Sequence, residues 1–155
     1  MRLLVVSDTH GNYPLLLKIV MEAGHIDSVV HLGDGEEEME LIAEATDAEI
    51  VRIAGNCDPH SNAPGEILLE REGKRLFFLH GDRYRVKLGL GNLEQIAREI
   101  EADAVFYGHT HIASDVMLSG IRFINPGTLK KDSECQSYAI ADVSENGINV
   151  NILKA

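Results

Sequence analysis

The sequence is poor in basic residues. Its 155 residues include 14 lysines and arginines against 25 aspartates and glutamates, which gives a formal net charge of −11 at pH 7. Proteins that bind long nucleic acids gain much of their affinity from cations that contact phosphates, so this charge argues against a large nucleic-acid partner. An acidic surface would also repel a phosphate ester, so such a substrate would require bound cations to offset the local field.

Cysteine is scarce as well. Cys57 and Cys135 lie on separate segments without CxxC spacing, which indicates a reduced compartment and argues against a disulfide framework or a structural zinc knuckle. The apolar run MRLLVV changes to charged and polar residues too soon for a signal peptide or a membrane span. We therefore expect a cytoplasmic protein with no membrane partner.

Phosphate-cradling loops are missing too. Gly89-x-Gly91 lacks the third glycine of a dinucleotide-binding fingerprint, and no GxxxxGK[ST] run occurs, so a P-loop nucleotide hydrolase is excluded. No linker, repeat or low-complexity segment divides the chain. We expect a single domain over residues 1–155, long enough to bury its own core.

The sequence does contain many short apolar, β-branched runs. Runs at 2–6, 28–32 and 49–53 alternate with helical periodicity, which predicts parallel strands. The later runs are joined by turns and predict hairpins; they lie at 66–70, 75–79, 114–118, 121–125, 137–143 and 147–153. A parallel first half and a largely antiparallel second half predict an α/β (α+β) fold of two stacked mixed β-sheets, a sandwich flanked by helices.

Two amphipathic helices are expected on the outer faces of these sheets. Their apolar positions recur at three- and four-residue spacing: Leu16, Ile19, Val20 and Ala23 in the first, and Leu93, Ile96, Ala97 and Ile100 in the second. We expect Asn12 to cap the first helix, where it could also contact a substrate, and Asn92 to begin the second.

Five polar segments each follow a predicted strand. They are SDTHGN (7–12), LGDG (32–35), GNCD (55–58), LHGD (79–82) and YGHTH (107–111). In sheets with parallel connections, functional groups gather beyond the carboxyl ends of the strands. We therefore expect the five segments to converge in space.

These segments carry seven side chains that can bind a metal ion: Asp8, His10, Asp34, Asn56, His80, His109 and His111. Carboxylate, amide and imidazole donors suit Mn, Fe, Ni, Zn or Mg, and the lack of thiolate ligands argues against a structural zinc site. Side chains alternate along an extended backbone, so Asp8 and His10 are expected to point to the same side, as are His109 and His111.

Seven ligands exceed the four that one tetrahedral ion needs, which favours two divalent cations, with Mn²⁺ or Ni²⁺ as the first candidates. Asp34 lies between two glycines that allow the backbone to approach closely, so it is the best candidate to bridge the two ions. Such a pair would bind phosphoryl oxygens and hold a hydroxide that attacks phosphorus in line with the departing alkoxide.

Five ordered motifs resemble the signature of the calcineurin-like metallophosphoesterases: Asp8-x-His10, Gly33-Asp34, Gly55-Asn56, His80 and Gly108-His109-x-His111. The resemblance spans residues 7–111. The compact length, the GNCD segment and the NPGT stretch at 125–128 are similar to the small phosphodiesterase branch of bacteria and archaea. The resemblance implies a β-sandwich flanked by helices and the hydrolysis of a small phosphodiester.

The resemblance also implies a division of the ligands between two metals. Asp8, His10 and His111 would bind one metal, Asn56, His80 and His109 the other, and Asp34 both. We assign catalytic roles to Asp34, Asn56 and Asp58, and substrate contacts to Asn12 and Cys57.

Two positions depart from the wider family. Cys57 replaces the histidine of Gly-Asn-His-Asp/Glu that assists the leaving group in many members. The proton donor is therefore unassigned, which favours substrates with good leaving groups. Asp82 replaces a second histidine after His80-Gly81; it would not bind metal itself but would help to orient His80.

Several alternatives remain open. The substrate could be a phosphomonoester, or the chain could be a non-catalytic scaffold like the related retromer subunit of eukaryotes, although no ligand position is missing here. Cys57 could be a nucleophile, but no His-Asp pair is dedicated to it. Glu36–Glu38 are expected to form a solvated first helical turn, and His31 is expected to be structural or solvated. The native metal and possible homo-oligomerisation are left open.

Overall fold

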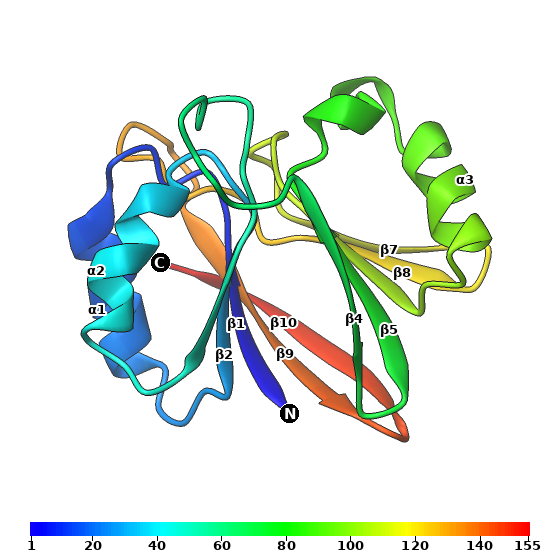
Figure 1. Cartoon of the computed structure of the whole chain (residues 1–155), viewed down its shortest axis with the longest axis horizontal. Helices are drawn as coiled ribbons and strands as arrows, with labels where there is room; N and C mark the ends of the chain where they lie inside the picture. The colour runs from blue at the N-terminus through cyan, green and yellow to red at the C-terminus, as the bar shows by residue number, and fades with distance from the viewer.

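Ten β-strands form two five-stranded sheets that face each other in the computed structural model, which describes residues 1–155 (Figure 1). The strands are β1 (Arg2–Val6), β2 (Ser28–His31), β3 (Glu49–Arg52), β4 (Glu66–Arg71), β5 (Lys74–Leu79), β6 (Ala104–Tyr107), β7 (Ser114–Leu118), β8 (Ile121–Asn125), β9 (Ser137–Ser144) and β10 (Gly147–Lys154). The predicted strands match these bounds within two residues. β6 was not among the apolar runs delimited above.

Both sheets mix parallel and antiparallel strands, which confirms the predicted sandwich. The first sheet has the order β10-β9-β1-β2-β3, in which β1, β2 and β3 are parallel and the hairpin β9–β10 is antiparallel to β1. The second has the order β4-β5-β6-β8-β7, in which β5, β6 and β8 are parallel. The expected parallel first half is confirmed by β1, β2 and β3, whereas the second half is mixed, because β5, β6 and β8 are parallel and only its hairpins are antiparallel. The C-terminal hairpin also returns to the N-terminal sheet.

The main core lies between the two sheets. It contains 15 buried residues, among them Val5 and Val30 from the first sheet and Phe78 and Phe106 from the second. The rings of Phe78 and Phe106 stack with their centroids 5.1 Å apart. The interior of this core is filled by side chains from alternate positions of each strand, so each strand is fixed in register.

Helices cover the outer face of each sheet (Figure 1). α1 (Tyr13–Glu22) and α2 (Met39–Ala43) cover the first sheet, and α3 (Gly91–Glu99) covers the second. The predicted apolar stripes are the buried faces, as Leu16 on α1 and Leu93 on α3 show with no exposed surface. No helix is long and apolar enough to cross a membrane.

Asn12 occupies the N-cap position of α1, as predicted, but it makes no side-chain cap bond; its Nδ2 donates to the carbonyl oxygen of Leu129 at 2.7 Å. The predicted start of the second helix at Asn92 is wrong. Asn92 lies inside α3, which begins at Gly91 and has Leu90 at its N-cap.

Candidate metal centre

The candidate ligands follow the carboxyl ends of parallel strands. Asp8 and His10 follow β1, Asp34 follows β2, Asn56 follows β3, His80 follows β5, and His109 and His111 follow β6. These ends lie along one rim of the sandwich, at the upper edge in Figure 1. The structure thus brings all five polar segments together.

Turns, rather than extended strands, place the paired ligands side by side. Five of the seven residues have a positive φ: Asp8 (53°), His10 (46°), Asp34 (60°), His109 (66°) and His111 (61°). The expectation that strand alternation orients these pairs is therefore wrong. Residues such as Asp and His adopt this left-handed region more readily than most, yet each instance costs on the order of 1–3 kcal/mol and persists only where its surroundings hold it.

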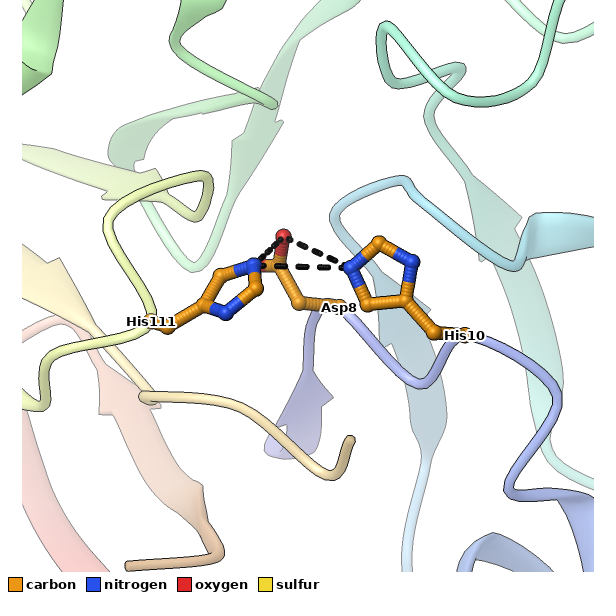
Figure 2. A group of neighbouring side chains, drawn as sticks. All are labelled: Asp8, His10 and His111. Atoms are coloured by element: carbon orange, nitrogen blue, oxygen red, sulfur yellow. Dashed lines mark hydrogen bonds and ion pairs between the residues drawn. The ribbon is translucent and has the colours of Figure 1, made fainter. Parts of the chain in front are cut away.

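The first ligand group consists of Asp8, His10 and His111 (Figure 2). Asp8 Oδ1 lies 3.1 Å from His111 Nε2 and 4.0 Å from His10 Nε2. The two imidazole nitrogens are themselves 3.4 Å apart. All three ligand atoms therefore point at one small volume, as Figure 2 shows.

The two oxygens of Asp8 have different surroundings. Oδ2 accepts hydrogen bonds from Ser7 Oγ at 2.5 Å and from the backbone N–H of His109 at 3.0 Å. Oδ1 is buried and has no hydrogen-bond partner. A buried carboxylate oxygen without a donor is costly unless a cation occupies the space in front of it.

The second ligand group consists of Asp34, His80 and His109, with Asn56 beside it. His80 Nε2 lies 3.4 Å from Asp34 Oδ2, 3.1 Å from His109 Nδ1 and 3.1 Å from Asn56 Oδ1. Burial and the charge of His80 lower the pKa of His109, which keeps its imidazole in the neutral form that binds metals.

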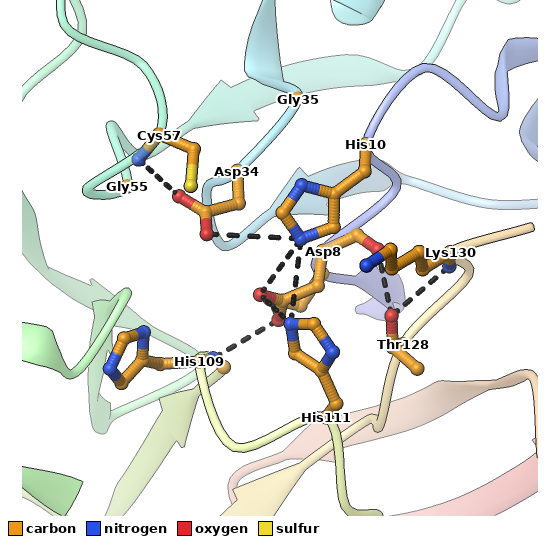
Figure 3. Close-up of polar contacts among 12 residues, drawn as sticks. Asp8, His10, Asp34, Gly35, Gly55, Cys57, His109, His111, Thr128 and Lys130 are labelled. Atoms are coloured by element: carbon orange, nitrogen blue, oxygen red, sulfur yellow. Dashed lines mark hydrogen bonds and ion pairs between the residues drawn. The ribbon is translucent and has the colours of Figure 1, made fainter. Parts of the chain in front are cut away.

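Asp34 lies between the two groups. Its Oδ2 is 3.4 Å from His80 Nε2. Figure 3 shows its other two contacts: Oδ2 is 3.9 Å from His10 Nε2, and Oδ1 accepts the backbone N–H of Cys57 at 2.7 Å. Burial raises the pKa of Asp34, but the bonds from His80 and Cys57 outweigh burial and hold that pKa well below its ordinary value. Asp34 is therefore a carboxylate at neutral pH.

A backbone contact fixes the ring of His80. Its Nδ1 lies 2.8 Å from the carbonyl oxygen of Leu32, which can only accept, so Nδ1 carries the proton. Nε2 then faces the ligand group. Burial would lower the pKa of His80, but the bond with Asp34 and the charge of Asp8 raise it overall.

The donor set fits divalent cations. In each group the ligand atoms lie within 4.8 Å of one another, and oxygen and imidazole nitrogen are the donors that Mn, Ni, Fe and Zn share. The Oδ1 atom of Asp8 is the strongest sign of the fit, because it is buried without a hydrogen bond and faces the imidazole nitrogens of His111 and His10, which are themselves metal donors.

Cys57 and Asp58 occupy different positions in the site. Cys57 is exposed, and together with His10 and Asp34 it forms a third group of neighbouring ligand atoms. Asp58 accepts the backbone N–H groups of Asp34, Gly35 and Gly55 at 2.7, 2.8 and 2.8 Å. Asp58 thus holds two loops together and has no contact with the histidines.

A cavity of about 280 Å³ opens beside His10, Asp34 and Cys57. Its lining also includes the carboxylates of Glu37, Glu38 and Asp58, and it contains no lysine or arginine. An anionic ligand would therefore meet only negative charge here unless cations were bound. Asn12 does not line this cavity.

The expectation of a solvated turn at Glu36–Glu38 is wrong for two of its three residues. Glu36 is buried and lies 3.5 Å from Arg52 Nη1. Glu38 Oε1 accepts the N–H of Gly11 at 2.6 Å and the hydroxyl of Thr9 at 2.9 Å. Glu37 alone is exposed.

Several supporting residues were missed in the sequence. Buried Asn125 donates from Nδ2 to the carbonyl oxygen of Gly108 at 2.9 Å and to Thr110 Oγ1 at 3.1 Å, so it fixes the loop of His109 and His111. Thr128 Oγ1 donates to the carbonyl oxygen of Asp8 at 2.8 Å (Figure 3). The NPGT stretch at 125–128 could have pointed to both residues, because it lies at the carboxyl end of β8, which is parallel to β6.

Comparisons with known proteins identify the family of the chain. Residues 1–146 match the calcineurin-like phosphoesterase superfamily domain. The chain is 31% identical to the probable metallophosphoesterase YsnB of Bacillus subtilis, over 97% of this chain and 89% of that protein. It is 28% identical to the phosphodiesterase YfcE of Escherichia coli, over 92% of this chain and 88% of that protein.

Solved structures with the same fold include a predicted phosphoesterase from Streptococcus pneumoniae, with a TM-score of 0.82 and 25% identity over 99% of this chain and 88% of that one. They also include Vps29 of Entamoeba histolytica complexed with Zn²⁺, with a TM-score of 0.80 and 17% identity over 99% of both chains. The second likeness shows the fold alone. With the family match over nearly its whole length, the chain belongs to the calcineurin-like phosphoesterase superfamily.

Proposed function

We propose that the chain hydrolyses a small phosphodiester with two bound divalent cations. The observation that carries this proposal is the position of Asp34, whose Oδ2 lies within 3.9 Å of imidazole nitrogens from both ligand groups. A carboxylate between two such groups is the arrangement that lets two cations share a ligand.

The residues divide between two cations. Asp8, His10 and His111 would hold the first, Asn56, His80 and His109 the second, and Asp34 both. When bound, such a pair supplies Lewis-acid activation of water and neutralises charge on the phosphoryl group. Mn²⁺ and Ni²⁺ are the first candidates, because the ligands combine hard oxygens with imidazole nitrogens.

Hydrogen bonds to one atom of Asp34 and one of His80 orient the other atom of each side chain toward the proposed metal site. The N–H of Cys57 holds Asp34 Oδ1, which leaves Oδ2 free to face both groups. The carbonyl of Leu32 holds the proton of His80 on Nδ1, which leaves Nε2 for the site. Asp58 is a positioning residue, because its three backbone bonds align the loops that carry Asp34 and Asn56.

Cys57 is suited to contact the substrate but not to attack it. Burial, with the nearby charges of Asp34 and Asp58, raises the pKa of the Cys57 thiol. The thiol is therefore protonated at neutral pH and is a poor nucleophile. With no imidazole at this position, esters whose leaving groups depart without protonation, such as aryl esters, should react fastest.

Charge favours diesters over monoesters. A diester carries one negative charge at neutral pH, whereas a monoester carries nearly two, and the cavity beside the centre is lined by carboxylates. Its volume of about 280 Å³ suits a small ester. The name phosphodiesterase carried by the E. coli relative supports the same substrate class.

The test compares metal-stripped and metal-reloaded protein on bis(p-nitrophenyl) phosphate and on p-nitrophenyl phosphate. We expect no turnover after stripping, recovery with Mn²⁺ or Ni²⁺, and a higher kcat/KM for the diester. Asp34→Asn keeps the size of the side chain but weakens the shared ligand, and should lower kcat at least 10²-fold. If reloaded protein cleaved neither ester, hydrolysis would be ruled out and a scaffold role in the same fold would be favoured.

A further inference from the structure

A relay of three hydrogen bonds, two of them buried and one partly buried, lies next to the first ligand group. It links Gly33, His31, Thr9 and Glu38, which come from three different segments. Thr9 and His31 have no exposed surface. None of the four residues belongs to either ligand group.

The donor and the acceptor of each bond in this relay can be assigned. The N–H of Gly33 can only donate, so His31 Nδ1, 3.1 Å away, is an acceptor without a proton. Burial lowers the pKa of His31 to about 4, so at neutral pH the ring carries one proton, on Nε2. That proton is donated to Thr9 Oγ1 at 3.0 Å, and the Thr9 hydroxyl in turn donates to Glu38 Oε1 at 2.9 Å.

The relay is bonded to the loop that carries Asp8 and His10. Thr9 lies between Asp8 and His10, both of which have a positive φ and need surroundings that keep them there. Glu38 Oε1 also accepts the N–H of Gly11 at 2.6 Å, directly after His10. The side chain of Thr9 and the backbone of Gly11 thus both donate to the carboxylate of Glu38.

We propose that the His31–Thr9–Glu38 relay holds Asp8 and His10 in the positions where they would bind a metal together with His111. This inference rests on the proposed two-metal function. The relay makes no bond to His80, His109 or Asn56. His80 is held by the carbonyl of Leu32, which lies between His31 and Gly33, whereas Thr9 contacts only the His31 side chain of that segment. Loss of the Thr9 hydroxyl should therefore weaken the first group and spare the second.

Calorimetric titration of the metal-stripped full chain with Mn²⁺ tests the proposal. Thr9→Val removes the hydroxyl but keeps the branched shape, and should weaken one of two binding steps roughly 10- to 100-fold. The weakened step should be the one that His111→Ala abolishes and that His109→Ala retains. Thr9→Ser restores the hydroxyl and should restore the affinity.

Thr46→Val is the matched control. Thr46 Oγ1 accepts the N–H of Ala48 in a loop away from both ligand groups, so this variant should bind as the unsubstituted chain does. Equal isotherms for Thr9→Val and the unsubstituted chain would overturn the proposal, as would equal weakening of both steps without rescue by Thr9→Ser. An unsubstituted chain that bound no Mn²⁺ would instead contradict the two-metal function itself.

Discussion

At the scale of single residues, the proposed metal centre involves an uncharged, buried imidazole, that of His31, in addition to the proposed ligands. Burial lowers the pKa of His31 from 6.5 to about 4, against the opposing charge of Asp58. Its ring must stay neutral to accept from Gly33 and donate to Thr9 at the same time. Protonation of His31 would turn the Gly33 contact into a clash between two donors.

Because His31 is buried, we expect the free energy of unfolding to depend on pH. Because the folded pKa of His31 is about 4 and its ordinary value is 6.5, the unfolded chain binds a proton first as the pH falls. The contribution of His31 to stability should be constant above about pH 6.5 and should fall by about 3 kcal/mol between pH 6.5 and pH 4. Urea unfolding with chelator present measures the loss.

His31→Gln removes the titrating group, and should lose less stability over the same pH range than the unsubstituted chain. His25→Gln is the control, since His25 is largely exposed. Parallel pH profiles for His31→Gln and the unsubstituted chain would show that His31 does not titrate as its burial requires.

The ligands themselves could be proposed from the sequence, but their surroundings could not. Asp8, His10 and Asp34 stand in short motifs with fixed spacing, so pattern alone selected them. The partners of Thr9 and His31 are set by contacts between residues more than 20 positions apart. Nothing local to either residue predicts such a contact.

At the scale of elements, the centre is made by loops that touch one another. A Cβ on Gly55 would lie 2.2 Å from Asp34 Oδ1 and 2.5 Å from the backbone N of Asp34. A Cβ on Gly33 would lie 2.6 Å from the backbone N of Gly55. The loops after β2 and β3 therefore meet only because glycine occupies both contact points.

Gly55→Ala should displace Asp34 and abolish the shared ligand, because backbone atoms cannot move aside cheaply. We expect at least a 10-fold loss of Mn²⁺ affinity by calorimetry. Gly91→Ala is the matched control: its Cβ would meet nothing within 4 Å, in α3. It should bind Mn²⁺ normally and gain about 0.5–1 kcal/mol of stability. Normal affinity in Gly55→Ala would contradict the close approach of these loops.

Strand and helix positions were largely predictable because apolar periodicity is a local property. The buried positions Leu16 and Leu93 follow directly from it. Sheet order was less predictable, since the return of β9 to the edge of β1 depends on pairing across more than 130 residues. The geometry of the turns was also missed, because φ at Asp8 and His10 is imposed by contacts from other segments.

At the scale of the whole molecule, a net charge of −11 coincides with carboxylates gathered around one rim. Bound cations would relieve this repulsion in the folded chain alone, because the ligands converge only on folding. Free metal at about 100 times the dissociation constant should stabilise the fold by about 2.7 kcal/mol per site.

Thermal unfolding measures this stabilisation. Saturating Mn²⁺ should raise the Tm of the stripped chain by on the order of 10 °C if two sites are filled. Asp34→Asn should show a clearly smaller rise. Equal shifts in the two proteins would show that Asp34 does not contribute to binding.

The most direct test of the central claim is an anomalous diffraction map from crystals soaked in Mn²⁺. The account predicts two peaks, one between Asp8, His10 and His111 and one between Asn56, His80 and His109, with Asp34 beside both. A single peak, or peaks away from Asp34, would contradict it.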